Sequence, residues 1–119
     1  MLPDAWFQRD AEACGWDLIE LKSRYATASH ELIARRMLDF PPPIIITIFD
    51  HDKLTFRRGS ETAPSFPLSP LESKCQHAAY TSGQPRNMDE RLHIQAWPIH
   101  EPDWKREILR TSFEDWQDE

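Results

Sequence analysis

The chain has 119 residues, of which 39% are hydrophobic and 29% charged, a composition typical of one soluble globular domain. Its formal net charge is −6, and four of those charges come from the last seven residues, which contain no Lys or Arg. The rest of the chain does not resemble the basic footprint of a dedicated nucleic-acid binder, and no apolar run approaches the roughly 20 residues of a membrane span.

The first forty residues are predicted to be helical. A segment over 2–14 ends at Gly15, a residue suited to the end of a helix. A second helix is expected over 17–25, beginning with an aspartate that can cap it. A third is expected over 27–38, and the three prolines at 41–43 mark the boundary because no helix continues through them.

After the prolines, the pattern changes to that of strands. The β-branched run over 44–49 predicts a buried strand. Alternating apolar and polar residues over 54–58 predict a half-buried partner, joined to the first strand by turn-forming residues over 50–53. The two strands are expected to form a hairpin, followed by a loop over 59–67.

A covering helix is predicted over 70–82. Ser69 is suited to its N-cap, a proline follows at the first helical position, and Glu72 stands three residues after the cap, which predicts a reciprocal capping box. The helix is expected to end near Gly83. Cys75 lies on its predicted apolar side, where a cysteine behaves as a small hydrophobic residue rather than as a nucleophile.

Two further strands complete the predicted sheet. Residues 91–99 alternate clearly between apolar and polar side chains. Residues 105–113 are interpreted as the fourth strand, with a helix as the alternative. The predicted fold is therefore α+β, with a helical lead-in over 1–40, a small domain over 41–114 and an acidic tail over 115–119. The sheet is expected to be antiparallel and roughly four-stranded, with one covering helix.

Two histidine–glutamate pairs begin the H-E-x-x-H motif of zinc peptidases without completing it. That motif needs two histidines four apart on one helical face, with the glutamate activating a water. The pair at 30–31 is followed by Ala34 in place of the second histidine, and the pair at 100–101 is followed by Pro102 and Trp104. We therefore assign no metal ligand, no catalytic residue and no cofactor, and we expect that the chain is not itself an enzyme.

The remaining local features indicate the compartment of the chain. Cys14 and Cys75 do not form a CxxC motif and cannot make a disulfide framework, so both are expected to be reduced thiols. The first ten residues lack the basic start and apolar run of a signal peptide. A cytoplasmic location is expected.

Residues 17–38 have the outline of a helix-turn-helix. Its second helix would offer His30, Arg35 and Arg36 to DNA. Glu31 would then approach phosphates unfavourably. A pair of packing helices is the preferred interpretation, and DNA contact is the alternative.

Aromatic residues gather near the last predicted turn. Trp97 and Trp104 bracket a proline-stiffened stretch that contains His100. Such a group is suited to line a small-molecule pocket, so these three residues are the candidate ligand-binding residues. Packing within a small sheet is the commoner role of such tryptophans.

Several motifs resemble the region that follows the catalytic helices in the ImmA/IrrE family of metallopeptidases. Residues 1–3, Met-Leu-Pro, resemble the end of the peptidase part, the Leu, Tyr, Thr and Ser pattern over 18–29 resembles the next segment, and residues 36–38 resemble the Arg-x-Leu with which the following helix closes. Residues 43–56, and 97–99 with 105–109, are similar to the α+β region of long-form members, which is likened to GAF sensor domains.

This resemblance implies a GAF-like regulatory or ligand-sensing C-terminal module. Its expected partners are the catalytic domain of the same protein or its upstream region, a small-molecule ligand and a second copy of the chain; neither DNA nor a membrane is expected. The family's H-E-x-x-H motif would lie before residue 1, so the chain is expected to be a fragment or a natural remnant. A DNA-binding helix-turn-helix element and a structural dimerisation domain are the alternatives.

Overall fold

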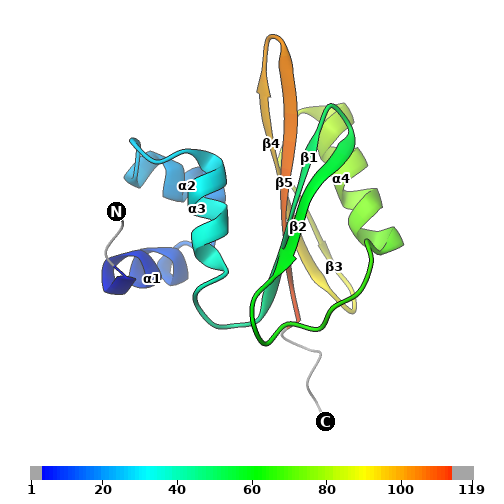
Figure 1. Ribbon diagram of the computed structural model, residues 1–119. Helices are drawn as coiled ribbons and strands as arrows, with labels where there is room; N and C mark the ends of the chain where they lie inside the picture. The colour runs from blue at the N-terminus through cyan, green and yellow to red at the C-terminus, as the bar shows by residue number, and fades with distance from the viewer. Residues whose placement is uncertain (1–3, 114–119) are drawn as a thin grey trace.

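A five-stranded antiparallel sheet lies between two helical layers in the computed structural model, which describes residues 4–113 (Figure 1). The strand order is β2–β1–β5–β4–β3. The helices are α1 (Asp4–Ala13), α2 (Leu18–Arg24), α3 (His30–Met37) and α4 (Pro70–Ser82). The strands are β1 (Ile44–Asp50), β2 (Lys53–Gly59), β3 (Arg86–Asp89), β4 (His93–Glu101) and β5 (Trp104–Ser112). The predicted α+β class is confirmed.

The first three helices begin and end where local chemistry requires. Gly15 follows α1 with a φ of +66°, a left-handed conformation that glycine adopts without strain. Asp17 caps α2 by accepting hydrogen bonds from the backbone N–H groups of residues 19 and 20. Ser29 caps α3 in the same way, so this helix begins at His30 and not at 27 as predicted.

The strand interpretation of residues 105–113 is confirmed and the helix alternative is wrong. Strand β5 pairs with β4 along its whole length and with β1 on its other side. It therefore lies at the centre of the sheet, where its alternating residues face both helical layers. Strand β4 continues to Glu101, two residues beyond the predicted end.

The fifth strand, β3, was not predicted. It has only four residues, Arg-Asn-Met-Asp, and most of its side chains are exposed. It pairs with β4 at the edge of the sheet, where Arg86 lies opposite Ala96. A short polar edge strand has no apolar alternation, so the sequence pattern gave no signal for it.

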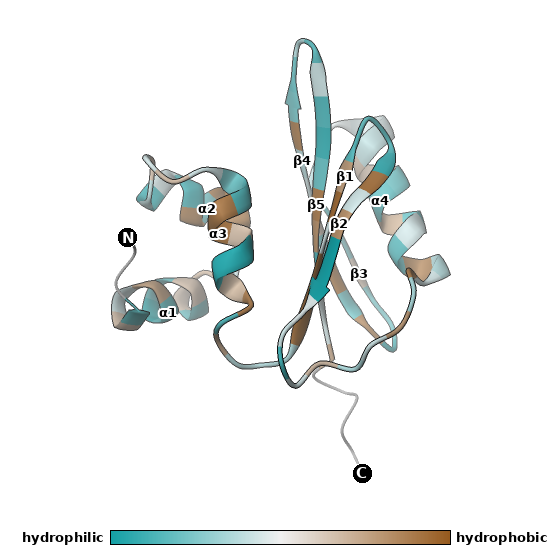
Figure 2. Cartoon of the chain, in the orientation of Figure 1, coloured by the Kyte–Doolittle hydropathy of each residue, from teal (hydrophilic) through white to brown (hydrophobic). Residues whose placement is uncertain are grey.

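Two hydrophobic clusters cover the two faces of the sheet. On one face, Ile44, Ile46, Ile48, Trp97 and Ile108 pack with Phe7, Leu18, Leu21, Ile33 and Met37 of α1–α3 and their flanking segments. On the other face, Ile45, Phe49, Ile94, Ala96 and Leu109 pack with Cys75 and Ala79 of α4. Figure 2 shows the resulting band of hydrophobic residues along the middle of the sheet and hydrophilic residues at the hairpin tips.

Each helical layer therefore shares a hydrophobic core with the face of the sheet that it covers. The predicted core position of Cys75 is confirmed: it is fully buried, and burial raises the pKa of its thiol to about 11.

The predicted acidic tail over 115–119 lies outside the described residues. Among residues 4–113, no helix is both long and apolar enough to cross a membrane.

The predicted capping box of α4 is present. Ser69 Oγ accepts from the Glu72 backbone N–H at 3.2 Å, and Glu72 Oε1 accepts from the Ser69 backbone N–H at 2.9 Å.

We expect Ser69→Ala to lower the free energy of unfolding by about 1 kcal/mol in urea denaturation, because it removes the cap. Ser73→Ala, at an exposed position of the same helix, is the control and is expected to change little. Equal effects of the two substitutions would contradict the assignment of the cap.

Candidate functional site

The three residues predicted to line a ligand pocket do not come together. Trp97 faces α1–α3 and is only 2% exposed, within the hydrophobic cluster of that face. His100 lies three residues further along β4 and faces α4, because alternate residues of a strand point to opposite faces. Trp104 lies at the tip of the β4–β5 hairpin, 47% exposed, and its Nε1 donates to Asp50 Oδ1 at 3.0 Å.

His100 instead belongs to a polar cluster around the buried Glu107, under the C-terminal half of α4. Its Nε2 lies 2.6 Å from Oε2 of Glu107, a carboxylate that is fully buried. Gln76 of α4 donates from Nε2 to Glu107 Oε1 at 3.0 Å and to Asp52 Oδ1 at 3.0 Å. Because a buried carboxylate is stable only with hydrogen-bonding partners, this cluster fixes the position of α4 on β5.

A second fully buried carboxylate, Glu72, anchors the N-terminal end of the same helix. Arg57 donates from Nη1 to Oε2 and from Nη2 to Oε1, both at 3.1 Å, and Thr111 Oγ1 donates to Oε2 at 2.6 Å. Burial acts to raise the pKa of Glu72, but the hydrogen bonds from Arg57, Thr111 and Ser69 outweigh it and hold this pKa below its ordinary value.

On the opposite face of the sheet, Arg106 joins α3 to the strands. Its Nη1 donates to Glu31 Oε1 at 2.9 Å, and its Nε donates to Asp50 Oδ1 at 2.6 Å. Arg35 pairs with the other oxygen of Glu31 at 2.8 Å and lies 4.0 Å from the centre of the Phe56 ring. These side chains of the helix-turn-helix-like segment therefore contact the protein's own sheet.

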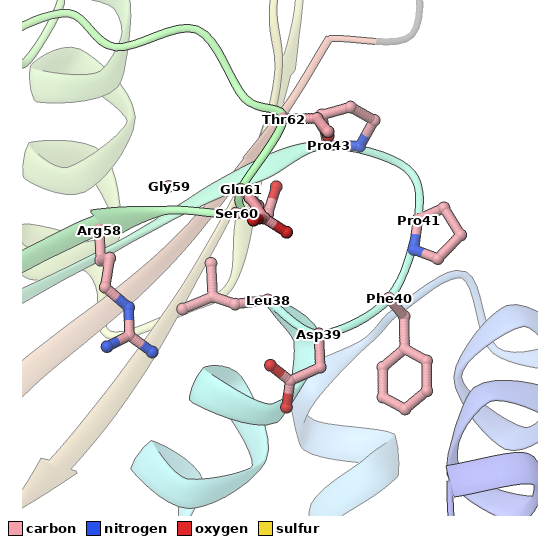
Figure 3. Close-up of a pocket in the computed structure, with 10 residues that line it drawn as sticks. All are labelled: Leu38, Asp39, Phe40, Pro41, Pro43, Arg58, Gly59, Ser60, Glu61 and Thr62. Atoms are coloured by element: carbon pink, nitrogen blue, oxygen red, sulfur yellow. The ribbon is translucent and has the colours of Figure 1, made fainter.

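A polar cavity of about 480 Å³ opens where the end of α3 meets the segment after β2 (Figure 3). In Figure 3, Arg58 lies on one side and the rings of Phe40, Pro41 and Pro43 on the other. Several of its polar groups already have partners within the chain. Asp39 pairs with Arg36 at 2.7 Å, and Ser60 Oγ exchanges hydrogen bonds with the backbone of Ile44.

The charged side chains of this cavity are exposed, so water can hydrogen-bond to them as well as a ligand could.

A second cavity, of about 730 Å³, is more apolar and lies between the start of α4 and the β3–β4 connection. We call it the α4 groove. Its lining residues are Phe66, Ser69, Pro70, Leu71, Lys74, Glu90, Arg91 and Leu92. A cavity of this size with apolar walls and a few charged groups is typical of small-molecule sites, so the α4 groove is the stronger candidate.

No family model matches the chain, and no curated protein or solved structure matches it. Among residues 4–113, no group of three or more His, Cys, Asp or Glu side chains is arranged to hold a metal ion. The identity of the site therefore depends on the geometry of the chain itself.

Sequence reasoning missed the α4 groove because its residues come from separate segments. Leu71 lies in the predicted covering helix over 70–82, and Leu92 lies in the predicted strand over 91–99. Nothing in the local pattern says that these two side chains and Phe66 line one cavity. In the sequence, Lys74 and Arg91 are charged residues of a predicted helix and a predicted strand, which gives no signal for a shared cavity.

The two tryptophans are expected to differ in their contributions to stability. Trp97→Ala should lower the free energy of unfolding by about 3–5 kcal/mol, because it leaves a cavity in the core. Trp104→Ala should cost less than about 1.5 kcal/mol, since it removes one hydrogen bond and the ring contacts with His51 and Arg106 at an exposed tip. Urea denaturation of both variants tests this, and a cost for Trp97→Ala no larger than that for Trp104→Ala would contradict the assignment.

Asp50 is expected to make stability depend on pH. Burial acts to raise its pKa, but hydrogen bonds from Arg106 and Thr55 outweigh it and hold the pKa below the ordinary 3.8. A carboxyl with a depressed pKa stabilises the fold above its unfolded pKa and loses that contribution on acidification.

We therefore expect Asp50→Asn to cost about 1–3 kcal/mol near pH 7. The difference from the unsubstituted chain should shrink as the pH falls below about 4. Urea denaturation between pH 3 and 7 measures this. Asp103→Asn at the exposed β4–β5 hairpin tip is the matched control. A cost of Asp50→Asn that does not change with pH would contradict the role of this carboxylate.

Proposed function

We propose that the chain is a non-catalytic regulatory or ligand-sensing module, and that the α4 groove is its ligand site. The observation that carries the proposal is the groove itself, an apolar cavity of about 730 Å³ with two cations on its wall. Small-molecule sites have this combination of apolar surface and few charged groups. The resemblance of the sequence to the C-terminal region of ImmA/IrrE-type metallopeptidases supports the same function.

The position of the groove suits a sensor. Ser69 and Leu71 line it and are close chain neighbours of Glu72, the buried carboxylate that holds the N-terminal end of α4. Glu72 is linked through Arg57 to Thr47 in the centre of the sheet. A ligand in the groove would therefore stabilise the helix start and the sheet contact together.

The proposed partner is the catalytic domain of an ImmA/IrrE-type metallopeptidase, in the same protein or upstream of this chain. The proposed location is the cytoplasm. Both cysteines are free thiols, Cys14 partly buried and Cys75 fully buried, which supports a reducing compartment.

The alternative as a DNA-binding element receives less support from the geometry. In the helix that would have to face DNA, Glu31 binds Arg106, Arg35 contacts the Phe56 ring, and the two residues pair with each other. An electrophoretic mobility shift assay with duplex DNA tests this alternative directly. A salt-sensitive shift that Arg35→Gln and Arg36→Gln abolish would favour it over ligand sensing.

Thermal unfolding in the presence of a panel of small metabolites tests the sensing proposal. At least one compound should raise the melting temperature, because a ligand that binds only the folded state stabilises it. The effect should be lost in Leu71→Ser, which makes the groove wall polar, and kept in Leu54→Ser, a matched change at an exposed leucine of β2. If no compound acts, or if Leu71→Ser leaves the effect unchanged, the structural-domain alternative is favoured.

A further inference from the structure

The α4 groove contains two cations that the fold does not use. Among residues 4–113, neither Lys74 nor Arg91 forms an ion pair, and both side chains lie exposed at the groove. Other cations of the chain have clear structural roles. Arg57 binds the buried Glu72, and Arg106 binds Asp50 and Glu31.

The apolar part of the groove lies directly beside these cations. Phe66, Leu71 and Leu92 belong to the hydrophobic cluster under α4, and each also lines the groove. The apolar wall is therefore a continuation of the core that reaches the surface. Glu90 is the one acidic residue of the lining, so Lys74 and Arg91 leave the groove with a net charge of +1.

We infer that the α4 groove binds a small amphipathic carboxylate, a compound with an aromatic or aliphatic body and one anionic end. This inference rests on the proposed sensing function and adds the chemical class of the ligand. The body would pack on Phe66, Leu71 and Leu92, and the carboxylate would meet Lys74 and Arg91.

Three physical arguments favour this class over others. Burial of an apolar body contributes to the free energy of binding in proportion to the apolar area that is removed from water. A carboxylate forms charge-assisted hydrogen bonds with Arg and Lys, stronger than those of a neutral group. A ligand with a cationic end would meet two like charges and one opposite charge, and a small polar anion would leave the apolar wall unused.

A matched set of probes tests the inference on the whole chain. 4-Phenylbutyrate is the expected ligand type, 4-phenylbutylamine has the same body with a cationic end, and acetate has the anionic end alone. Backbone amide resonances in titrations by NMR should report binding of 4-phenylbutyrate at the non-proline residues of 66–74 and at residues 90–92. Lys74→Gln and Arg91→Gln should each weaken it about threefold, and together about tenfold. Lys53→Gln, at an exposed lysine of β2, is the control and should leave the affinity unchanged.

The outcomes separate the two proposals. Equal binding of 4-phenylbutylamine would overturn the carboxylate class while leaving a ligand site in the groove. Acetate binding as tightly as 4-phenylbutyrate would mean an adventitious anion only, and would also overturn the inference. If none of the three probes perturbs the groove while a compound of the metabolite panel does, the ligand class is wrong and the sensing function stands. If neither the probes nor the panel perturb it, both proposals fail.

Discussion

Strands β1 and β5 are buried on both faces over most of their length, and the rest of the structure depends on this constraint. A strand that is buried on both sides cannot alternate between apolar and polar residues. Strand β1 meets the requirement with a nearly continuous isoleucine run that supplies side chains to both clusters. The helices α1–α3 are therefore a structural layer of the sheet, because without them Ile44, Ile46 and Ile48 would face water.

The same constraint explains the buried carboxylates. Glu107 points from the central strand β5 into the layer under α4, and Glu72 points from α4 toward the sheet. A buried charge is costly unless it is paired and hydrogen-bonded. His100 and Gln76 satisfy one carboxylate and Arg57 with Thr111 the other, so α4 is fixed to the sheet at two points along its length. The α4 groove adjoins one of these points.

Local signals in the sequence were sufficient for most of the fold. The isoleucine run, the Ser69 and Glu72 pair and the glycines that follow α1 and α4 each determine a local structure through nearby residues, so the pattern predicts it. Strand β3 was missed because its pairing with β4, and not its own composition, makes it a strand. Contacts between distant segments could not be predicted either, because nothing near Glu107 in the sequence indicates that Gln76 donates a hydrogen bond to it.

The candidate site was less predictable for the same reason. Trp97 and His100 are close in sequence, but strand alternation sends them to opposite faces of the sheet. The groove residues Leu71, Arg91 and Leu92 are brought together only when α4 packs on β4. A cavity formed by packing cannot be read from any single segment.

Native-state hydrogen exchange tests most directly the claim that the sheet needs the layer formed by α1–α3. The buried residues of α1 and α3, Phe7, Ile33 and Met37, share a cluster with Ile46 and Ile108. The backbone amides of these helices and of β1 and β5 should therefore be exposed in the same unfolding event, with similar free energies and a similar dependence on denaturant. Exchange of α1 and α3 at a much lower free energy, with β1 and β5 still fully protected, would show that the sheet stands without its helical layer and would contradict the account.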